Sequence, residues 1–450
     1  MNRIQFQNEI RKKLSNLSFV RDVGRITSVK GGVVAAEGLG IAARMGSRVL
    51  IRMRNGGYLP GEIIQLGDSA LTILPEGPLD GVGLDDRVIL TGISSIAPDD
   101  SWIGRVIDPD GQAIDGRPLA SGPASRPLQA PPPPPTERRA LGDRLETGLA
   151  LFNTVLPIVE GQRLGLFAGS GVGKSTLLGE LAKKMQSDIV VIGMIGERGR
   201  EVRHFVESVL GPEGLARSVI VAATSDQSAL ARRRCAWTAM AVAEHFRDTG
   251  RSVLLLADSI TRFAEAHREV AVAAGEAPVL RGYPPSTAHM IMSLCERAGP
   301  GIDGTGDITG IFSILVAGSD MEEPIADILR GVLDGHVVLD RTIAERGRFP
   351  AVDVLRSVSR SLPACATPAQ NTSIASYRRI LSHYSRNEMM INAGLYSHGT
   401  DPDIDQAISL WPDLDAFAAR AQDAGIDAAF NALDVILRRA ATHRPPLRQN

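Results

Sequence analysis

The chain contains the stretch Gly165-Leu-Phe-Ala-Gly-Ser-Gly-Val-Gly-Lys-Ser-Thr176. An apolar run comes first, a glycine-rich loop follows, and apolar residues at helical spacing begin after Thr176. Glycines let the backbone turn tightly, so the N–H groups between Gly171 and Gly173 can surround a phosphate. The positive end of the following helix adds attraction for an anion. The stretch therefore predicts a strand, a phosphate-binding loop and a helix of a nucleotide hydrolase.

The side chains of this loop predict ATP and Mg²⁺ as its ligands. Lys174 is expected to reach the β- and γ-phosphates, and the Ser175 hydroxyl to bind Mg²⁺. The alternative is an ordinary glycine-rich turn, which a lysine directly before two hydroxyl residues disfavours. One departure from the usual pattern is Ala168, where a glycine normally stands. The predicted nucleotide-binding residues here are Gly169, Ser170, Gly171, Val172, Gly173, Lys174, Ser175 and Thr176.

Length and composition set the class of protein to expect. A chain of 450 residues predicts two to four domains. The net charge of −2 and the pI near 6.5 give no reason to expect nucleic acid as a partner. The three cysteines lie far apart without metal-ligand spacing, which suits a reducing cytoplasm. No apolar run approaches the roughly 20 residues that cross a bilayer, so we expect a cytoplasmic protein.

Residues 1–20 are predicted to form a basic amphipathic helix, because Phe6, Ile10, Leu14 and Leu17 share one face. A capping helix on the next domain is one interpretation. A helix that binds a partner protein or an anionic membrane surface is the other.

The remainder of the chain divides into three predicted domains. Residues 21–95 contain six short β-branched runs separated by glycine turns, which predict a small closed β-barrel. Residues 96–370 alternate apolar strands with amphipathic helices, which is typical of a mainly parallel α/β domain. The turn-rich start of that region includes a proline-rich connector at 127–136, expected to be a stiff extended spacer. Residues 371–450 lack strand runs and predict an α-helical domain.

Within the α/β region we expect strands at Arg163–Phe167, Asp188–Gly193, Ser218–Ala223, Ser252–Ala257 and Gly310–Ala317. In the last region we expect helices at Leu410–Ala424 and Ala428–Ala441.

Two further segments carry candidate catalytic groups. Asp258 ends the apolar run Ser252-Val-Leu-Leu-Leu-Ala-Asp258, where a carboxylate can lie beside the phosphate loop and order Mg²⁺ with its waters. Glu197 follows another apolar strand and can polarise the water that attacks the γ-phosphate. The arginines Arg198 and Arg200 either stabilise phosphate charge or pair with nearby glutamates.

With these residues the chain resembles the catalytic subunits of hexameric rotary-type ATPases, and among them the flagellum-specific and type III secretion export ATPases. The resemblance covers nearly the whole chain and implies a RecA-like ATPase core. The blocks that carry it are Phe167-Ala-Gly-Ser-Gly-Val-Gly-Lys-Ser175, Gly196-Glu-Arg-Gly-Arg-Glu-Val202, Thr224-Ser-Asp-Gln-Ser228, Asp258-Ser-Ile-Thr-Arg262, Arg281-Gly-Tyr-Pro-Pro-Ser286, Glu322-Glu-Pro-Ile-Ala-Asp327, Leu333-Asp-Gly-His-Val-Val-Leu339 and Ser357-Val-Ser-Arg360.

The resemblance implies a role for each matching residue. Lys174 and Ser175 match the phosphate and Mg²⁺ contacts of the family. Glu197 matches the catalytic base, and Arg198 matches an adjacent arginine that faces phosphate. These residues would form the catalytic centre within one subunit.

Further residues match the surroundings of that centre. Glu201 and Asp258 match the carboxylates that hold the waters around Mg²⁺, and Arg262 matches an arginine on a strand–loop behind the site. Phe349 matches an aromatic residue that packs on adenine. Arg360 matches an arginine finger that enters the neighbouring subunit's site, so the resemblance implies a homohexamer. Departures from the family pattern at His267 and Asp307 affect none of these roles.

Several functions fit these features. The favoured one is an export ATPase that drives type III protein export, flagellar rather than virulence-type. The region 392–408 disfavours a β-type rotary ATP synthase subunit, because its sequence resembles the export family. Glu197 disfavours a non-catalytic subunit. An RNA-translocating helicase would need several aromatic side chains in the barrel for base stacking, and Tyr58 is the only one between Val20 and Gly92.

The resemblance also implies partners and a location. We expect a regulatory or stator-like protein at the N-terminal region, with export substrates and their chaperones as cargo. No nucleic acid is expected. The protein would be cytoplasmic and peripheral at the inner-membrane export apparatus.

Overall fold

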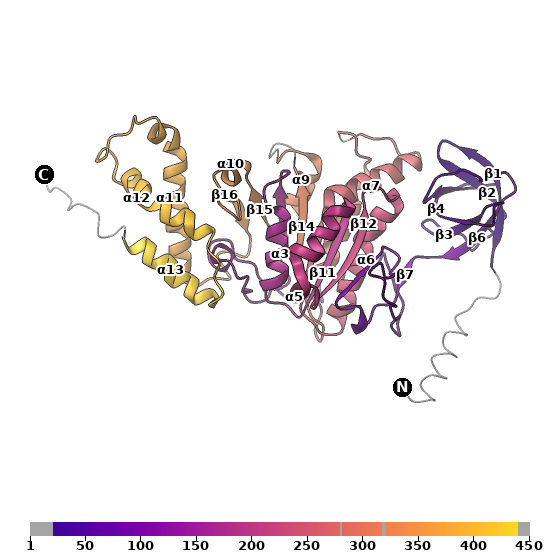
Figure 1. Cartoon of the computed structure of the whole chain (residues 1–450), viewed down its shortest axis with the longest axis horizontal. Coiled ribbons are helices and arrows are strands. Elements are labelled where there is room, and N and C mark those ends of the chain that lie inside the picture. The colour runs from indigo at the N-terminus through magenta and orange to yellow at the C-terminus, as the bar shows by residue number, and fades with distance from the viewer. Residues whose placement is uncertain (1–20, 280, 317–320, 440–450) are drawn as a thin grey trace, which may run out of the picture.

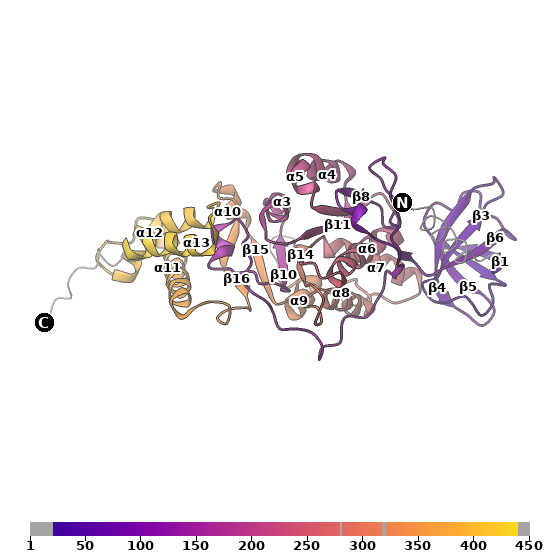
Figure 2. The ribbon, with the colours of Figure 1, turned by 90° about the horizontal axis from the view of Figure 1, so that it is seen from below.

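The computed structural model describes residues 21–279, 281–316 and 321–439. Figures 1 and 2 show three parts in a row, with a β-barrel at one end, a helix-covered sheet in the middle and a helical bundle at the other end. This order confirms the predicted fold class. The helix predicted for residues 1–20 lies outside the described residues, and the exact domain boundaries stay predictions.

The N-terminal part is a closed barrel of antiparallel strands in the order β1-β2-β5-β4-β3-β6. Alternate side chains of these strands point inward, and the interior is filled by aliphatic residues such as Ile26, Val34, Ile51 and Ile63. The six predicted strands are therefore correct. Their bounds are β1 (Val23–Lys30), β2 (Val33–Glu37), β3 (Arg48–Arg52), β4 (Tyr58–Leu66), β5 (Leu71–Pro75) and β6 (Arg87–Gly92).

The central sheet has eight strands in the order β16-β15-β10-β14-β13-β11-β12-β8, parallel except for the antiparallel pair β15 and β16. All five predicted strands are present, with shifted ends. The bounds are β8 (Arg105–Ile107), β10 (Arg163–Ala168), β11 (Ile189–Glu197), β12 (Ser218–Thr224), β13 (Val253–Asp258), β14 (Ile308–Leu315), β15 (Gly335–Leu339) and β16 (Val352–Ser359).

Three of these strands, β8, β15 and β16, were not expected from the sequence. β8 is three residues long and lies in the turn-rich connector. It becomes a strand by pairing with β12, which is far away in the sequence, so its own residues give no strand signal. β16 forms an edge of the sheet and mixes buried with exposed positions, which hides it from a search for apolar runs. A further two-stranded sheet joins β7 (Ser95–Ile96) to β9 (Arg126–Pro127). The prolines at 131–135 lie in neither a helix nor a strand, and the predicted spacer role of 127–136 stays a prediction.

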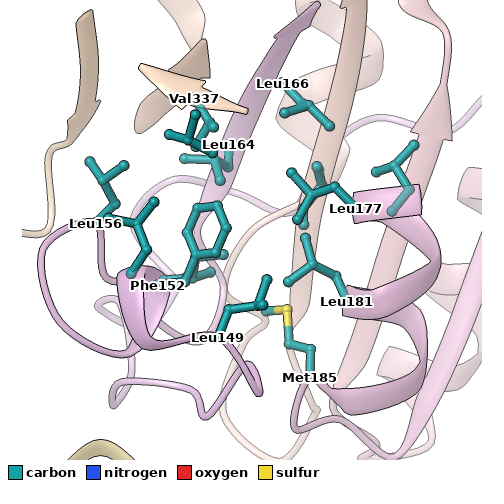
Figure 3. Packing of buried hydrophobic residues seen from close by; sticks show 14 of the residues in the cluster. Leu149, Phe152, Leu156, Leu164, Leu166, Leu177, Leu181, Met185 and Val337 are labelled. Atoms are coloured by element: carbon teal, nitrogen blue, oxygen red, sulfur yellow. The ribbon is translucent and has the colours of Figure 1, made fainter. Parts of the chain in front are cut away.

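Helices cover both faces of the central sheet, as parallel strands with helical crossovers require (Figures 1 and 2). On one face, Leu164 and Leu166 of β10 pack near Leu177 and Leu181 of α3, which fixes the helix that follows the phosphate loop (Figure 3). The helices of this part are α2 (Ala150–Asn153), α3 (Lys174–Lys184), α4 (Gly199–His204), α5 (Gly211–Leu215), α6 (Ala229–Asp248), α7 (Ile260–Ala273), α8 (Ser286–Arg297), α9 (Pro324–Val332) and α10 (Arg341–Glu345), with the 3-10 helix η1 (Asp100–Trp102) and the π-helix η2 (Phe205–Leu210).

The C-terminal part is formed by α11 (Pro368–Asn392), α12 (Pro402–Ala418) and α13 (Gly425–Arg439). The sequence-based prediction missed α11, although a capping box of Thr367 and Gln370 marks its start. It also placed the middle helix too late: α12 begins at Pro402, with Asp401 as its cap, and residues 419–424 are not part of it. The last predicted helix corresponds to α13.

The barrel is joined to the central domain by buried ion pairs on α6. Arg233 donates to Glu62 of β4 at 2.6 Å, and both side chains are more than 90% buried. The Arg233 guanidinium also lies over the Trp237 ring at 4.9 Å. The neighbouring Arg234 contacts Glu76 of the barrel. A buried charge needs its partner because water cannot replace it, so these pairs fix where the barrel sits.

Replacing Glu62 by Ala should lower the free energy of unfolding by about 3–5 kcal/mol, because Arg233 is left buried and unpaired. Urea denaturation of the purified protein measures this. The control is Glu207→Ala, which breaks the exposed pair of Arg203 and Glu207 and should cost less than about 1 kcal/mol. Equal losses in the two variants would contradict the docking role.

Candidate active site

The phosphate loop joins β10 to α3 in the way that the sequence predicts. Its glycines at 171 and 173 have φ of +77° and +88°, a left-handed region that favours glycine. A Cβ atom at Gly173 would also lie 3.1 Å from the ring of Phe349. The helix begins at Lys174 immediately after this turn, so its free N–H groups face the loop. Phe349 is half exposed beside the loop, where the resemblance puts an adenine-binding ring.

Parallel pairing brings the carboxyl ends of β10, β14, β13 and β11 to one edge of the sheet. Asp258 is the last residue of β13 and Glu197 the last residue of β11. The register aligns Asp258 with Met194, so β11 runs further and carries Glu197 beyond it. The backbone of Glu197 is held by the Ser225 N–H, which donates to its carbonyl at 3.0 Å.

These strand ends place two carboxylates around one lysine. The Lys174 ammonium donates to Asp258, and its Nζ lies 3.7 Å from Oε1 of Glu197. The buried Ser313 hydroxyl of β14 donates to the same oxygen of Asp258 at 2.5 Å. Ser313 was not predicted, although a hydroxyl within the apolar strand Ile311-Phe-Ser-Ile-Leu315 is the signal that could have revealed it.

The environment of Glu197 changes its acidity. Burial raises the pKa of Glu197 to about 7, and the negative charge of Asp258 adds to this rise while Lys174 opposes it. A carboxyl group with a pKa near neutrality can exchange a proton at physiological pH, which is the property that a general base needs.

A cleft of about 970 Å³ opens above this edge of the sheet. Most predicted site residues line it. Asp258 and Val172 are instead buried next to it, and Phe349 and Arg360 lie outside its lining. The predicted residues in the lining are Gly169, Ser170, Gly171, Gly173, Lys174, Ser175, Thr176, Glu197, Arg198, Glu201 and Arg262.

The arginines of the cleft are paired with acids on its rim. Arg198 lies 3.5 Å from Glu201, and Arg262 lies 2.8 Å from Glu265. Arg262 belongs to the first turn of α7, so the strand–loop position implied by the resemblance is wrong. These pairs are partly exposed and therefore weak enough to open when a phosphate enters.

Part of the cleft wall is formed by residues that were not predicted as site residues. Arg268 lies over the ring of Tyr283 at 5.2 Å, and Arg281 lines the cleft beside them. Arg281 has a φ of +47°, which is uncommon for a residue other than glycine. Glu323 at the start of α9 completes this wall.

Arg360 follows the last residue of β16 and is exposed. Its guanidinium Nη2 donates to the carbonyl of Arg330 at 3.0 Å. It is absent from the lining of its own chain's cleft. The structure therefore brings together the predicted site residues of one subunit, and leaves Arg360 available at the surface.

The donor set fits a hydrated Mg²⁺ bound together with phosphate. Ser175 offers an exposed hydroxyl at the loop, and Asp258 and Glu201 offer carboxylates nearby. Mg²⁺ keeps several waters and takes only one or two protein ligands, so it needs no closed cage. The described residues contain no group of three or more His, Cys, Asp or Glu side chains arranged to hold a metal alone.

Comparisons with known proteins agree with this geometry. The family described as ATP synthase alpha/beta family, nucleotide-binding domain, matches residues 148–359. The family described as T3SS EscN ATPase C-terminal domain matches residues 366–434.

Similar whole proteins include flagellum-specific ATP synthases. The chain is 45% identical to that of Caulobacter vibrioides, over 92% of this chain and 95% of the relative, and 40% identical to that of Salmonella typhimurium, over 94% and 95%. Among solved structures, the assembled ATPase EscN from the enteropathogenic E. coli type III secretion system is 34% identical, with a TM-score of 0.84, covering 92% of this chain and 100% of EscN.

The chain therefore belongs to the ATP synthase alpha/beta family of nucleotide-binding proteins. Within it, the protein is an ATPase of the type III export class, on the branch of the flagellum-specific enzymes.

The raised pKa of Glu197 predicts the pH profile of the reaction. If Glu197 is the base, kcat/KM should rise with pH and level off above about 7, because the carboxyl group must lose its proton first. Steady-state kinetics from about pH 5.5 to about pH 8.5 measure this, because that range extends about one and a half units on either side of neutrality. The residual activity of Glu197→Gln should not show this rise of kcat/KM with pH. A profile that is flat through neutrality would count against the assignment.

Proposed function

We propose that the protein hydrolyses Mg²⁺-ATP in a homohexameric ring and thereby energises type III export of flagellar components. The observation that carries this proposal is the arrangement of Lys174 between Asp258 and Glu197 at the strand ends below the cleft. Arg360 of a neighbouring subunit supplies the arginine that the site of a single chain lacks.

In this mechanism the phosphates of ATP bind the N–H groups of the loop and of the start of α3. Lys174 exchanges Asp258 for the β- and γ-phosphates, because a phosphate carries more charge than a carboxylate. Ser175 would bind Mg²⁺ and Asp258 and Glu201 would hold its waters, and the ion when bound would neutralise charge at the phosphates. Phe349 packs on adenine, while Arg262 and Arg198 face the phosphates.

The proton of the reaction is handled by Glu197. Its carboxylate orients the attacking water and takes a proton as the water attacks the γ-phosphate. Burial of the carboxyl group keeps its pKa close to the working pH, so the group can accept the proton and release it after each turnover.

Arg360 is proposed to act in the neighbouring subunit. A trans arginine stabilises the charge on the transferring phosphoryl group and can contribute roughly 10³-fold or more to the rate. It requires an assembled ring. The solved structures of assembled EscN, and of EscN with its central stalk EscO, are of similar proteins and support an oligomer with a stalk-like partner here.

The same proposal extends to partners and location. We expect a regulatory or stator-like protein at residues 1–20, and export substrates with chaperones as further partners. In the described part of the chain no helix combines the length and hydropathy needed to cross a membrane. A peripheral position at the cytoplasmic face of the export apparatus fits this. The barrel's aliphatic interior and single tyrosine give nucleic acid no stacking platform.

Replacing Glu197 by Gln should lower ATP turnover by about 100- to 10,000-fold while Mg-ATP still binds, because an amide cannot take the proton. Turnover and binding of a fluorescent ATP analogue measure this in the purified protein. In cells that lack the native gene, the variant should fail to restore flagellar export. Retention of more than about a tenth of the wild-type turnover would refute the base.

Mixing two inactive variants should restore part of the activity. Arg360→Ala chains keep an intact phosphate loop, and Lys174→Ala chains keep an intact finger, so a mixed ring contains complete sites. ATPase activity of the mixture, compared with each variant alone, measures this. Activity per wild-type chain should also rise with protein concentration. No rescue, with turnover per chain independent of concentration, would contradict a finger that acts in trans.

A further inference from the structure

The arginine finger proposed above is held by one short segment, residues 330–334, which runs from the last turn of α9 to the residue before β15. The guanidinium of Arg360 donates to the carbonyl of Arg330, and its backbone N–H donates to the carbonyl of Asp334, both at 3.0 Å. Within the described residues the guanidinium makes no ion pair, so its charge stays available for a phosphate. The position of the finger therefore depends on the position of the segment 330–334.

That segment is itself fixed by the carboxylate of Asp334. Its Oδ2 accepts from the backbone N–H and Nε of Arg163, each at 3.0 Å, and its Oδ1 accepts from Nη2 of Arg163 at 3.1 Å. Two parallel contacts between a guanidinium and a carboxylate restrict direction as well as distance. Arg163 is the first residue of β10, the strand that leads to the phosphate loop.

A second anchor joins the same point to the base of the finger. The buried Gln162 amide donates to the Asp334 carbonyl at 3.0 Å and to the Ser359 hydroxyl at 3.1 Å. Ser359 directly precedes Arg360, and its hydroxyl donates to the Pro157 carbonyl at 2.7 Å. Asp334 thus lies where the start of β10 and the end of β16 are joined.

The finger lies among other basic groups. Arg330 and Arg360 are close enough to His336 to contribute to the lowering of its pKa, after its burial. Arg330 pairs with Glu322 at 3.6 Å, whereas the Arg360 guanidinium has a carbonyl acceptor. The carbonyl contacts hold the guanidinium without neutralising it.

We infer that Asp334 is a positioning residue for the arginine finger, which acts by fixing the segment that holds Arg360. This inference rests on the proposed action of Arg360 in the neighbouring subunit. In the proposed mechanism Asp334 contacts neither the nucleotide nor the attacking water. Its loss should therefore impair the site of the neighbour that receives the finger, and leave the phosphate loop of its own chain intact.

The test is Asp334→Asn, which keeps the size of the side chain but loses the charge-paired two-point contact with Arg163. We expect kcat to fall by about ten- to a hundredfold, as for a catalytic group misplaced by about 1 Å. The KM for ATP and the binding of a fluorescent ATP analogue should stay within about twofold of the wild-type values, because the cleft is unchanged.

Mixing experiments separate loss of the finger from loss of the fold. Asp334→Asn chains mixed with Lys174→Ala chains should regain activity, since the second chain supplies a well-placed finger to an intact site. Mixed with Arg360→Ala chains they should not, because neither chain then offers a competent finger. Arg163→Lys, which keeps the charge but loses the two-point contact, should show the same pattern more weakly.

The matched control lies at the opposite edge of the sheet. Asp115 makes a similar two-point contact with Arg105 of β8, at 2.7 and 2.8 Å, and also accepts from a backbone N–H. Asp115→Asn should therefore cost comparable stability. It should still restore activity to Arg360→Ala chains, because its own finger is correctly held.

Two results would overturn the inference. If Arg360→Ala and Lys174→Ala rescue each other but Asp334→Asn and Lys174→Ala do not, Asp334 supports its own site and not the finger. If Asp334→Asn rescues Arg360→Ala as well as Asp115→Asn does, the finger does not need Asp334. Failure of the Arg360→Ala and Lys174→Ala pair would instead remove the trans finger itself, and the positioning role with it.

Discussion

The interaction on which the site depends is the ion pair between Lys174 and Asp258, with Glu197 beside it. It requires three strand ends at one edge of a parallel sheet and a helix that starts directly after a glycine turn. The apolar packing of β10 against α3 holds that helix in place (Figure 3). Without phosphate, the carboxylates satisfy the lysine. In the proposed mechanism a phosphate takes over the lysine, which leaves the carboxylates for Mg²⁺ waters and proton transfer.

The same crowding explains the acidity of Glu197. One lysine can neutralise only one of the two nearby carboxylates. Because burial penalises the remaining negative charge, the pKa of Glu197 rises to about 7. The crowding of carboxylates at the sheet edge therefore gives Glu197 a pKa that suits proton transfer. Arg360, in contrast, is kept without an acidic partner in the described part of its own chain, which suits a charge that serves another subunit.

The sequence predicted what depends on neighbouring residues in the chain. The phosphate loop, Asp258 at a strand end and the alternating barrel strands each leave a local pattern, and the structure contains them. Ser313 leaves only a weak local sign, a hydroxyl within an apolar strand, and its contact with Asp258 depends on pairing between distant segments. Tyr283 lines the cleft through packing between distant segments, which its own stretch of sequence does not record. The edge strand β16 and the polar helix α11 were missed because neither contains a long apolar run. The role of Arg360 came from the resemblance, because one chain shows no neighbour.

The most direct measurement is a high-resolution structure of the assembled protein with Mg²⁺ and a slowly hydrolysed ATP analogue. We expect the Lys174 ammonium to leave Asp258 and contact the β- and γ-phosphates, and Arg360 of the neighbouring subunit to lie within hydrogen-bond distance of the γ-phosphate. A structure in which Lys174 still pairs with Asp258, with every Arg360 remote from bound nucleotide, would contradict it.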